Sequence, residues 1–457
     1  MSVSSPLHPR TTLVAAALGF VVVLLDVSVV NVALDALRTS FSTDVAGLQW
    51  VVNAYTFIFA ALLLMAGALG DRFGARAIFI SGFILFTLAS LGCGLAPTLP
   101  ALVVARLVQG VGAALLVPNS LSLLNQAFPD KGERSRAVGW WGAAGGIALA
   151  AGPVIGGFLV THFGWRSVFL INIPVGLIGL VLTIRYSAPS PRNERRSLDL
   201  PGQAAAIIAL ASLAIALTDA THLGWAHPRI LVALGVAVLS AIGLILIEVR
   251  SRAPMLPLSF FSSSAFSIAS IIGVIVNFAY YGLIFVFSLF FQLEQHFSPQ
   301  QTGLAFLPMT IVLMVMNIIA GRLITRLGAR RLMVSGLVLA AGGYLLLIPV
   351  SVGGSYWQLV VPMLMAASGI ALMVPTMTNM TLSSVDPSRA GIASGVLNTA
   401  RQVGGMLGVA TCGYFVRDTA PAAFMQGMHL SLIVAVVLLF FGAALSFFFL
   451  QRSRENK

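Results

Sequence analysis

Charged residues are scarce in this sequence. Asp, Glu, Lys and Arg make up 9% of the 457 residues, whereas soluble domains carry roughly 25%. Hydrophobic residues make up 58%. A chain of this composition cannot cover itself with a polar surface, so most of it must face lipid or other helices. The composition therefore predicts an integral membrane protein.

Cysteine and lysine are scarcer still. The two cysteines, Cys93 and Cys412, lie inside long apolar runs, so no disulfide framework is expected. Neither of the two lysines, Lys131 and Lys457, follows a glycine, so the chain has no phosphate-binding GxxxxGK[ST] loop and ATP is not its direct energy source. The six histidines fall outside the apolar runs or at their ends, without metal-ligand spacing. We expect no cofactor, no metal and no enzymatic activity, because a membrane enzyme or receptor would need clustered nucleophiles, metal ligands or a sizeable soluble domain.

Apolar runs long enough to cross a bilayer, about 18 to 25 residues, account for most of the chain. They predict fourteen spans, near 11–34, 48–70, 77–96, 101–124, 138–161, 166–185, 202–219, 229–247, 266–291, 301–323, 331–350, 357–382, 389–416 and 428–450. Polar turn clusters at 128–136 and 189–201 bound several of them. The first run is long enough to be a retained helix, so no cleaved signal peptide is expected.

The net charge of +12 comes from residues scattered through short turns, which argues against a nucleic-acid partner. With the amino terminus in the cytoplasm, 20 of the 26 Lys and Arg residues fall on the cytoplasmic side and 4 on the other, and Arg106 and Arg401 lie within spans. Positive residues are retained on the cytoplasmic side, and a miscounted helix would scramble this ratio. The bias predicts that both termini are cytoplasmic.

A ten-residue turn occurs twice, as GALGDRFGAR at 67–76 and, with substitutions, as GRLITRLGAR at 321–330. Each copy joins the end of one apolar run to the start of the next. Such internal repeats are typical of secondary transporters. The offset of 254 residues exceeds half the chain, which indicates an insertion between the halves. We expect a six-helix bundle at 1–185, a linker with two inserted helices at 186–262, and a second six-helix bundle at 263–457.

Five segments resemble motifs of the major facilitator superfamily, and in particular of its fourteen-span drug:proton antiporters. They are LDVSVVNVAL at 25–34, GALGDRFGAR at 67–76, RLVQGVGAALLVP at 106–118, AGPVIGG at 151–157 and WRSVFLINIPVG at 165–176. The sequence departs from the family pattern where Asp35 replaces a proline and Ala148 a glycine, and where Thr325 in the second turn replaces Asp71 of the first. The last difference suggests that the two halves are not equivalent gates.

The resemblance implies an all-α transporter in the bacterial inner membrane, monomeric and driven by the proton gradient, which exports small amphipathic drugs. One alternative is a dedicated exporter of a single endogenous metabolite or antibiotic. Another is a proton-coupled uptake symporter, against which the antiporter-like run at 151–157 argues.

Asp26 is the one acidic side chain that we place deep inside a span. A charge at the centre of a membrane helix costs roughly 2.5–3.5 kcal/mol on insertion scales, so a functional or paired role is expected. We expect Asp26 to carry the proton and Arg106 to be its electrostatic partner, since both fall in the outer half of the membrane. The alternatives are a structural hydrogen bond for Asp26 and the bracing of backbone carbonyls for Arg106.

The remaining site predictions concern gating and substrate. The resemblance assigns a cytoplasmic gate to Gly67, Asp71, Arg72, Gly74 and Arg76, although the arginines also serve as topology anchors. Small residues in the antiporter motif predict close helix contact between the halves, or ordinary tight packing: Gly152, Pro153, Gly156 and Gly157. Gly404 and Gly408 have similar spacing. Substrate-binding candidates between the halves are Tyr55, Asn277, Tyr280, Tyr281, Phe285, Asn317, Asn379, Asn398 and Gln402.

Overall fold

The computed structural model describes residues 8–193, 198–251, 254–351, 354–386 and 389–450, and within these ranges all regular structure is helical. The first half contains α1 (Pro9–Val32), α2 (Leu34–Phe41), α3 (Val45–Phe73), α4 (Ala75–Leu95), α5 (Leu99–Ala127), α6 (Lys131–Phe163), α7 (Ser167–Leu170) and α8 (Asn172–Tyr186). Two helices follow in the middle of the chain, α9 (Leu200–Leu223) and α10 (Pro228–Arg250). The second half contains η1 (Leu258–Ser262), α11 (Ser264–Leu289), the π-turn η2 (Phe290–Glu294), α12 (Pro299–Leu327), α13 (Ala329–Leu347), α14 (Tyr356–Ser383), α15 (Ala390–Phe415) and α16 (Pro421–Phe449).

Thirteen spans in the described part of the chain are long and apolar enough to cross a membrane, which makes the protein a multi-pass membrane protein. The remaining predicted span, 389–416, coincides with α15, a helix of 26 residues. At 1.5 Å per residue this helix is about 39 Å long, enough for a bilayer. It is less apolar than the others because it contains several glycines and Arg401. Fourteen spans therefore stay a prediction that depends on α15.

Caps and glycines, rather than the limits of the apolar runs, set the helix ends. Ser298 and Gln301 form a capping box at the start of α12. Asp130 caps α6, which begins at Lys131, so the sequence-based turn at 128–136 is too long by a helical turn. The predicted span 166–185 is interrupted at Ile171, which separates α7 from α8.

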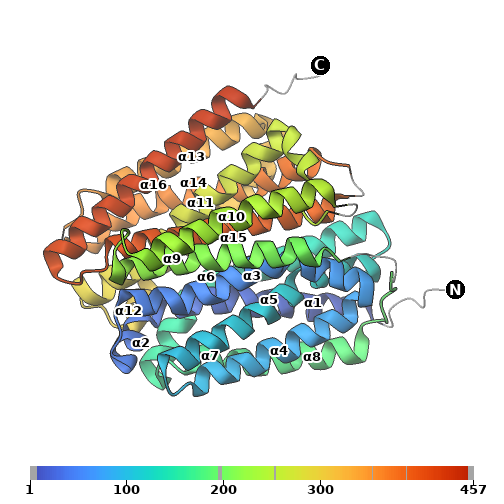
Figure 1. The fold of residues 1–457 in the computed structure, drawn as a ribbon, viewed down its shortest axis with the longest axis horizontal. Coiled ribbons are helices and arrows are strands. Elements are labelled where there is room, and N and C mark those ends of the chain that lie inside the picture. Colours follow the sequence, from blue (N-terminus) through green and yellow to red (C-terminus); the bar gives the residue numbers. More distant parts are fainter. Residues whose placement is uncertain (1–7, 194–197, 252–253, 352–353, 387–388, 451–457) are drawn as a thin grey trace.

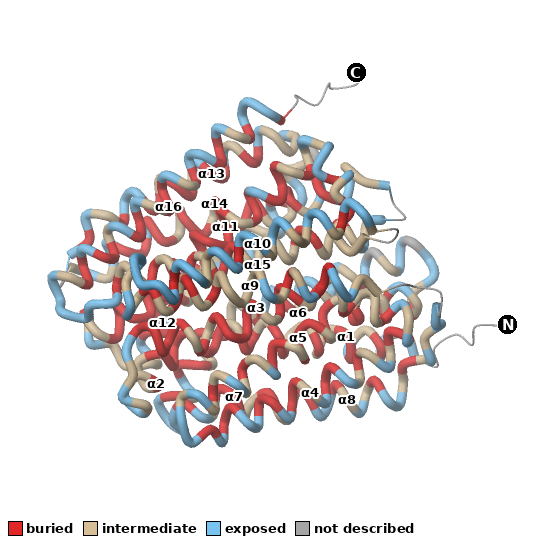
Figure 2. The backbone as a smooth tube through the Cα atoms, viewed as in Figure 1, coloured by how far each residue is buried: buried red, intermediate tan, exposed pale blue. Residues whose placement is uncertain are grey.

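Six long helices pack together in each half of the molecule. In Figure 1 most of the first half, in blue to green, lies below most of the second half, in yellow to red, with α12 next to the first half. Helix α3 packs against α15 and α6 against α12, and these two pairs join the halves. Helix α9 packs against both α3 and α15, while α10 packs mainly against α9. The inserted pair thus covers the α3–α15 contact, and Figure 2 shows much of its surface exposed.

The two ends of the helix bundle differ. The terminal side is the end where α1 begins and α16 ends (Figure 1), and the far side is the opposite end, where α1 ends and α3 begins. On the far side hydrogen bonds join the halves: Ser288 donates to the Asn31 carbonyl at 2.5 Å and Gln292 to the Val32 carbonyl at 3.2 Å. On the terminal side a cavity of about 970 Å³ lies between α3, α5 and α15. The structure is closed on the far side and hollow on the terminal side.

Candidate functional site

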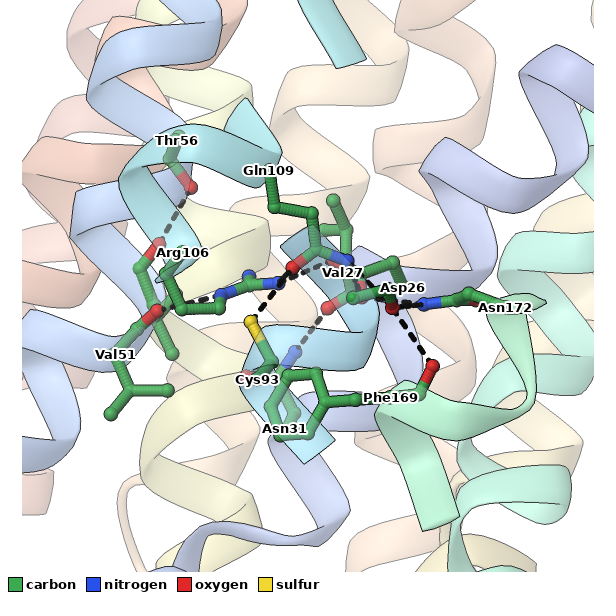
Figure 3. Close-up of polar contacts among 12 residues, drawn as sticks. Asp26, Val27, Asn31, Val51, Thr56, Cys93, Arg106, Gln109, Phe169 and Asn172 are labelled. Atoms are coloured by element: carbon green, nitrogen blue, oxygen red, sulfur yellow. Dashed lines mark hydrogen bonds and ion pairs between the residues drawn. The ribbon is translucent and has the colours of Figure 1, made fainter. Parts of the chain in front are cut away.

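A fully buried carboxylate on α1, Asp26, is the centre of a polar cluster in the first half (Figure 3). Its Oδ2 pairs with Nη1 of Arg106 at 2.5 Å. Its Oδ1 accepts hydrogen bonds from the side-chain amides of Gln109 and Asn172, both at 2.9 Å. Arg106 is 1% exposed and the other three side chains are 0% exposed, so the whole ion pair is shielded from water. The structure thus brings together the two residues to which the sequence assigned proton coupling.

A serine hydroxyl forms a second layer around this ion pair. Oγ of Ser90 accepts from Gln109 at 3.2 Å and from Asn172 at 3.1 Å, and donates to the Phe169 carbonyl at 2.8 Å. These bonds fix the two amides so that their N–H groups face Asp26. Because α1, α4, α5 and α8 each contribute a side chain, the position of the carboxylate depends on the packing of four helices.

Arg106 also connects the cluster to α3. Its Nε donates to the Val51 carbonyl at 3.1 Å. Its guanidinium lies 4.3 Å from the centre of the Tyr55 ring, within the range of a cation–π interaction. Arg106 therefore pairs with Asp26 and also donates to a backbone carbonyl, while its part in proton coupling stays a prediction.

Sequence reasoning missed Gln109, Asn172 and Ser90. Gln109 follows Arg106 by three residues, which places both on the same face of α5. Asn172 lies within the quoted segment 165–176, and a buried amide next to a membrane aspartate was the signal that could have singled it out. Ser90 offered no signal, because a lone serine in an apolar helix usually bonds to its own backbone.

The repeated turn has the same geometry in both halves. Gly74 and Gly328 both have positive φ, 97° and 76°, which a residue with a side chain adopts only with strain. Two residues later, Arg76 donates to the Ile184 carbonyl of α8 at 2.7 Å, and Arg330 donates to the Phe447 carbonyl of α16. Each arginine ties the turn to the last helix of its own half.

Two of the other gate residues lie at the cavity. Gly67 and Asp71 line it, and the Asp71 carbonyl accepts from the Asn193 amide at 2.9 Å. Arg72 lies 5.4 Å from the ring centre of its neighbour Phe73. A gating role for these residues stays a prediction.

The antiporter motif on α6 contacts two different helices. A Cβ on Gly152 would lie 2.4 Å from Cβ of Ser28 on α1, and one on Gly156 would lie 2.9 Å from the Val29 carbonyl oxygen. A Cβ on Gly157 would lie 2.5 Å from the Pro299 carbonyl oxygen of α12, in the other half. The motif therefore contributes to packing within the first half as well as to contact between the halves.

Two related contacts complete this picture. The carbonyl of Pro153 lies 2.1 Å from the position of a Cβ on Gly303 of α12, so this proline also borders the contact between the halves. Gly404 and Gly408 have no such role, since each faces the backbone of α11 within the second half.

The structure places the nine substrate-binding candidates in different surroundings, and their role in binding stays a prediction. Tyr280 and Tyr281 pack edge to face, with ring centres 5.1 Å apart. Asn398 lines the cavity, whereas Asn379 is exposed. Phe285 is 0% exposed within the apolar core. Tyr55 is buried and Gln402 is half-buried. Asn277 and Asn317 each donate to the backbone carbonyl four residues earlier in the chain.

Known proteins with similar sequences are resistance and transport proteins. The chain is 40% identical over 406 residues to a methylenomycin A resistance protein of Streptomyces coelicolor, covering 89% of this chain and 85% of that protein. It is 38% identical over 441 residues to a methylenomycin A resistance protein of Bacillus subtilis, covering 95% and 94%. It is 36% identical over 402 residues to the multidrug resistance protein Stp of Mycobacterium tuberculosis, covering 88% and 75%.

The fold also has a solved counterpart. The crystal structure of a D-xylose-proton symporter superimposes with a TM-score of 0.71 at 16% identity, covering 97% of this chain and 98% of that one. Residues 16–409 match the model of the Major Facilitator Superfamily. The protein is therefore a transporter rather than an enzyme, and its chain belongs to the Major Facilitator Superfamily.

Proposed function

We propose that the protein exports amphipathic drugs or antibiotics from the bacterial cytoplasm in exchange for protons, by alternating access. The observation that supports proton coupling is the buried ion pair of Asp26 and Arg106. Two charges removed from water are costly to bury, and an aspartate within the membrane is a functional residue by default. The names of the relatives, which are resistance proteins, support drug or antibiotic export.

The orientation follows from the charge distribution of the turns. With both termini in the cytoplasm, the terminal side faces inward, and the structure represents an inward-open state with the far side closed. Substrate then enters the cavity of about 970 Å³ from the cytoplasm.

Proton binding acts through Arg106. A proton on Asp26 removes the negative charge that holds the guanidinium. Arg106 is bonded to the Val51 carbonyl on α3. Two residues away on that helix, Gln49 donates to the carbonyls of Val409 and Ala410 on α15, at 3.1 and 2.7 Å. Loss of the ion pair therefore acts on α3, the helix that bonds to α15 of the other half through Gln49.

Uphill export from proteoliposomes tests this mechanism. The substrate is a compound to which the protein confers resistance in a panel of chemically unrelated antibiotics. We expect Asp26→Asn to abolish export driven by an imposed pH gradient, because Asn cannot carry the proton. The matched control is Asp35→Asn, whose carboxylate is 31% exposed and pairs with Arg38. Export by Asp26→Asn at the wild-type rate would show that Asp26 is not the proton carrier.

The second candidate is a dedicated exporter of one antibiotic. Two relatives named for methylenomycin A resistance, at 40% and 38% identity, favour it. The same panel separates the two candidates, since a dedicated exporter confers resistance to a single compound and a multidrug exporter to several unrelated ones.

A further inference from the structure

Arg401 on α15 is a cation within a predicted span, and its hydrogen-bonding capacity is largely unused. An arginine side chain has five N–H donors. The one hydrogen bond recorded for the guanidinium within the described residues runs from Nη1 to Oδ1 of Asn398, at 3.4 Å. The Nε atom is buried and has no partner there.

The contrast with Arg106 is direct. Arg106 has a carboxylate, an amide oxygen and a backbone carbonyl as partners. None of the ion pairs formed by the described residues includes Arg401. Because Asp26 is already paired with Arg106, it does not serve as the counter-ion of Arg401. A charge of this kind in a membrane helix is costly, so a functional role is the default expectation.

Tyr281 is the tyrosine near this cation, and Tyr55, which lies against Arg106, is in turn near Tyr281. Tyr281 of α11 is within electrostatic range of both Arg401 and Tyr55 of α3. The Tyr55 hydroxyl is buried and has no hydrogen-bond partner among the residues that the structure describes. Arginine N–H groups and a free hydroxyl beside aromatic rings suit a ligand that joins an anionic head to an apolar body.

One residue of the cavity lining contacts Arg401. Asn398, which accepts the single hydrogen bond from Arg401, also lines the cavity. The cavity, with a volume of about 970 Å³, is large enough for a drug-sized molecule. The lining itself carries three acidic residues, Asp71, Asp199 and Glu248, and one basic residue, Arg389, so the positive charge of Arg401 lies behind the lining, beside Asn398.

We propose that Arg401, with Tyr55 and Tyr281, forms a binding site for the carboxylate of an amphipathic organic anion. The inference rests on the proposed export function, whose substrate class it names. The planar guanidinium matches the two oxygens of a carboxylate, which a lysine at this position would not.

Matched probes test the site directly on the purified full-length protein in lipid nanodiscs. The probes are 2-naphthylacetate, the neutral 2-naphthylacetamide and the cationic 2-(2-naphthyl)ethylammonium, which have the same apolar body. We expect the acetate to bind the wild type at least tenfold more tightly than the amide and to raise its unfolding temperature. Arg401→Gln should abolish this preference, since a charge-assisted hydrogen bond contributes a factor of ten or more.

Three further variants guard against a purely structural effect. Arg401→Lys keeps the charge but not the fork, and we expect it to retain part of the preference even where the Gln variant fails to fold. Tyr55→Phe removes one hydroxyl and should weaken acetate binding several-fold. Arg417→Gln is the control, because Arg417 is exposed and donates to the Tyr414 carbonyl.

The proposal is overturned if the wild type binds the acetate no better than the amide, if the ammonium binds best, or if Arg401→Gln keeps the preference. Export of neutral or cationic compounds by a protein that does not bind the acetate would reject the anion site and leave the export function standing. Binding of 2-naphthylacetate without export of any compound in the panel would reject the export function and leave the anion site standing.

Discussion

Replacing Asp26 by Asn leaves the guanidinium of Arg106 buried without a counter-charge. Arg106 is 1% exposed, so water cannot take over the role of the carboxylate. Removal of one partner from a buried ion pair costs about 3–5 kcal/mol. We expect Asp26→Asn and Arg106→Gln each to lower the free energy of unfolding by about this amount. The double variant should cost less than the sum, by about 2–3 kcal/mol, because it leaves no unpaired charge.

Urea unfolding of the purified protein in detergent measures this cycle. The chain supplies a control in the pair formed by Asp35 and Arg38, whose N–O distance is 2.8 Å but whose side chains are 31% and 33% exposed. The same cycle there should give a coupling of less than about 1 kcal/mol. Additive effects at Asp26 and Arg106, within about 0.5 kcal/mol, would refute the argument that these two charges depend on each other.

Two other predictions concern the contacts between the halves. Gly157→Val places a side chain against the Pro299 carbonyl, so it should abolish export and leave the far side open, as measured by thiol reagents at an introduced cysteine. Gly146→Val on the same helix is the control and should have neither effect, because nothing lies within 4 Å of a Cβ there. Gln49→Leu removes the bonds to the α15 carbonyls, including the 2.7 Å bond to Ala410, and should raise far-side labelling several-fold. Unchanged labelling would show that these bonds do not hold the far side closed.

The repeated turn and the apolar runs were sufficient to predict the frame of the molecule, because a membrane leaves few arrangements for long apolar helices. The positions of the helix ends were less predictable. Helix α6 begins at Lys131, well before its apolar run, because the Asp130 cap and water stabilise the first turns without help from lipid. The break at Ile171 has no glycine or cap, and its signal in the sequence is Pro174, which has no N–H to donate to the Leu170 carbonyl.

The site was predictable in its charges and not in its neutral partners. A charge in a lipid environment stands out in a sequence, so Asp26 and Arg106 could be paired by depth alone. Gln109 and Ser90 could not, since the orientation of a neutral side chain depends on packing between helices that are distant in sequence. For the same reason the surroundings of the nine substrate candidates differ: Tyr281 is within electrostatic range of Arg401, while Phe285 belongs to the core.

The arginines of the repeated turn have a mechanical consequence. Arg76 connects the α3–α4 turn to α8, and Arg330 connects the α12–α13 turn to α16, so each bonds an early turn of its half to the last helix of the same half. In each half this hydrogen bond links the turn to the last helix, so the helices of that half are held together as one body. The two halves can then move relative to each other as units. Loss of one of these arginines would loosen the packing of its own half and leave the other half unchanged.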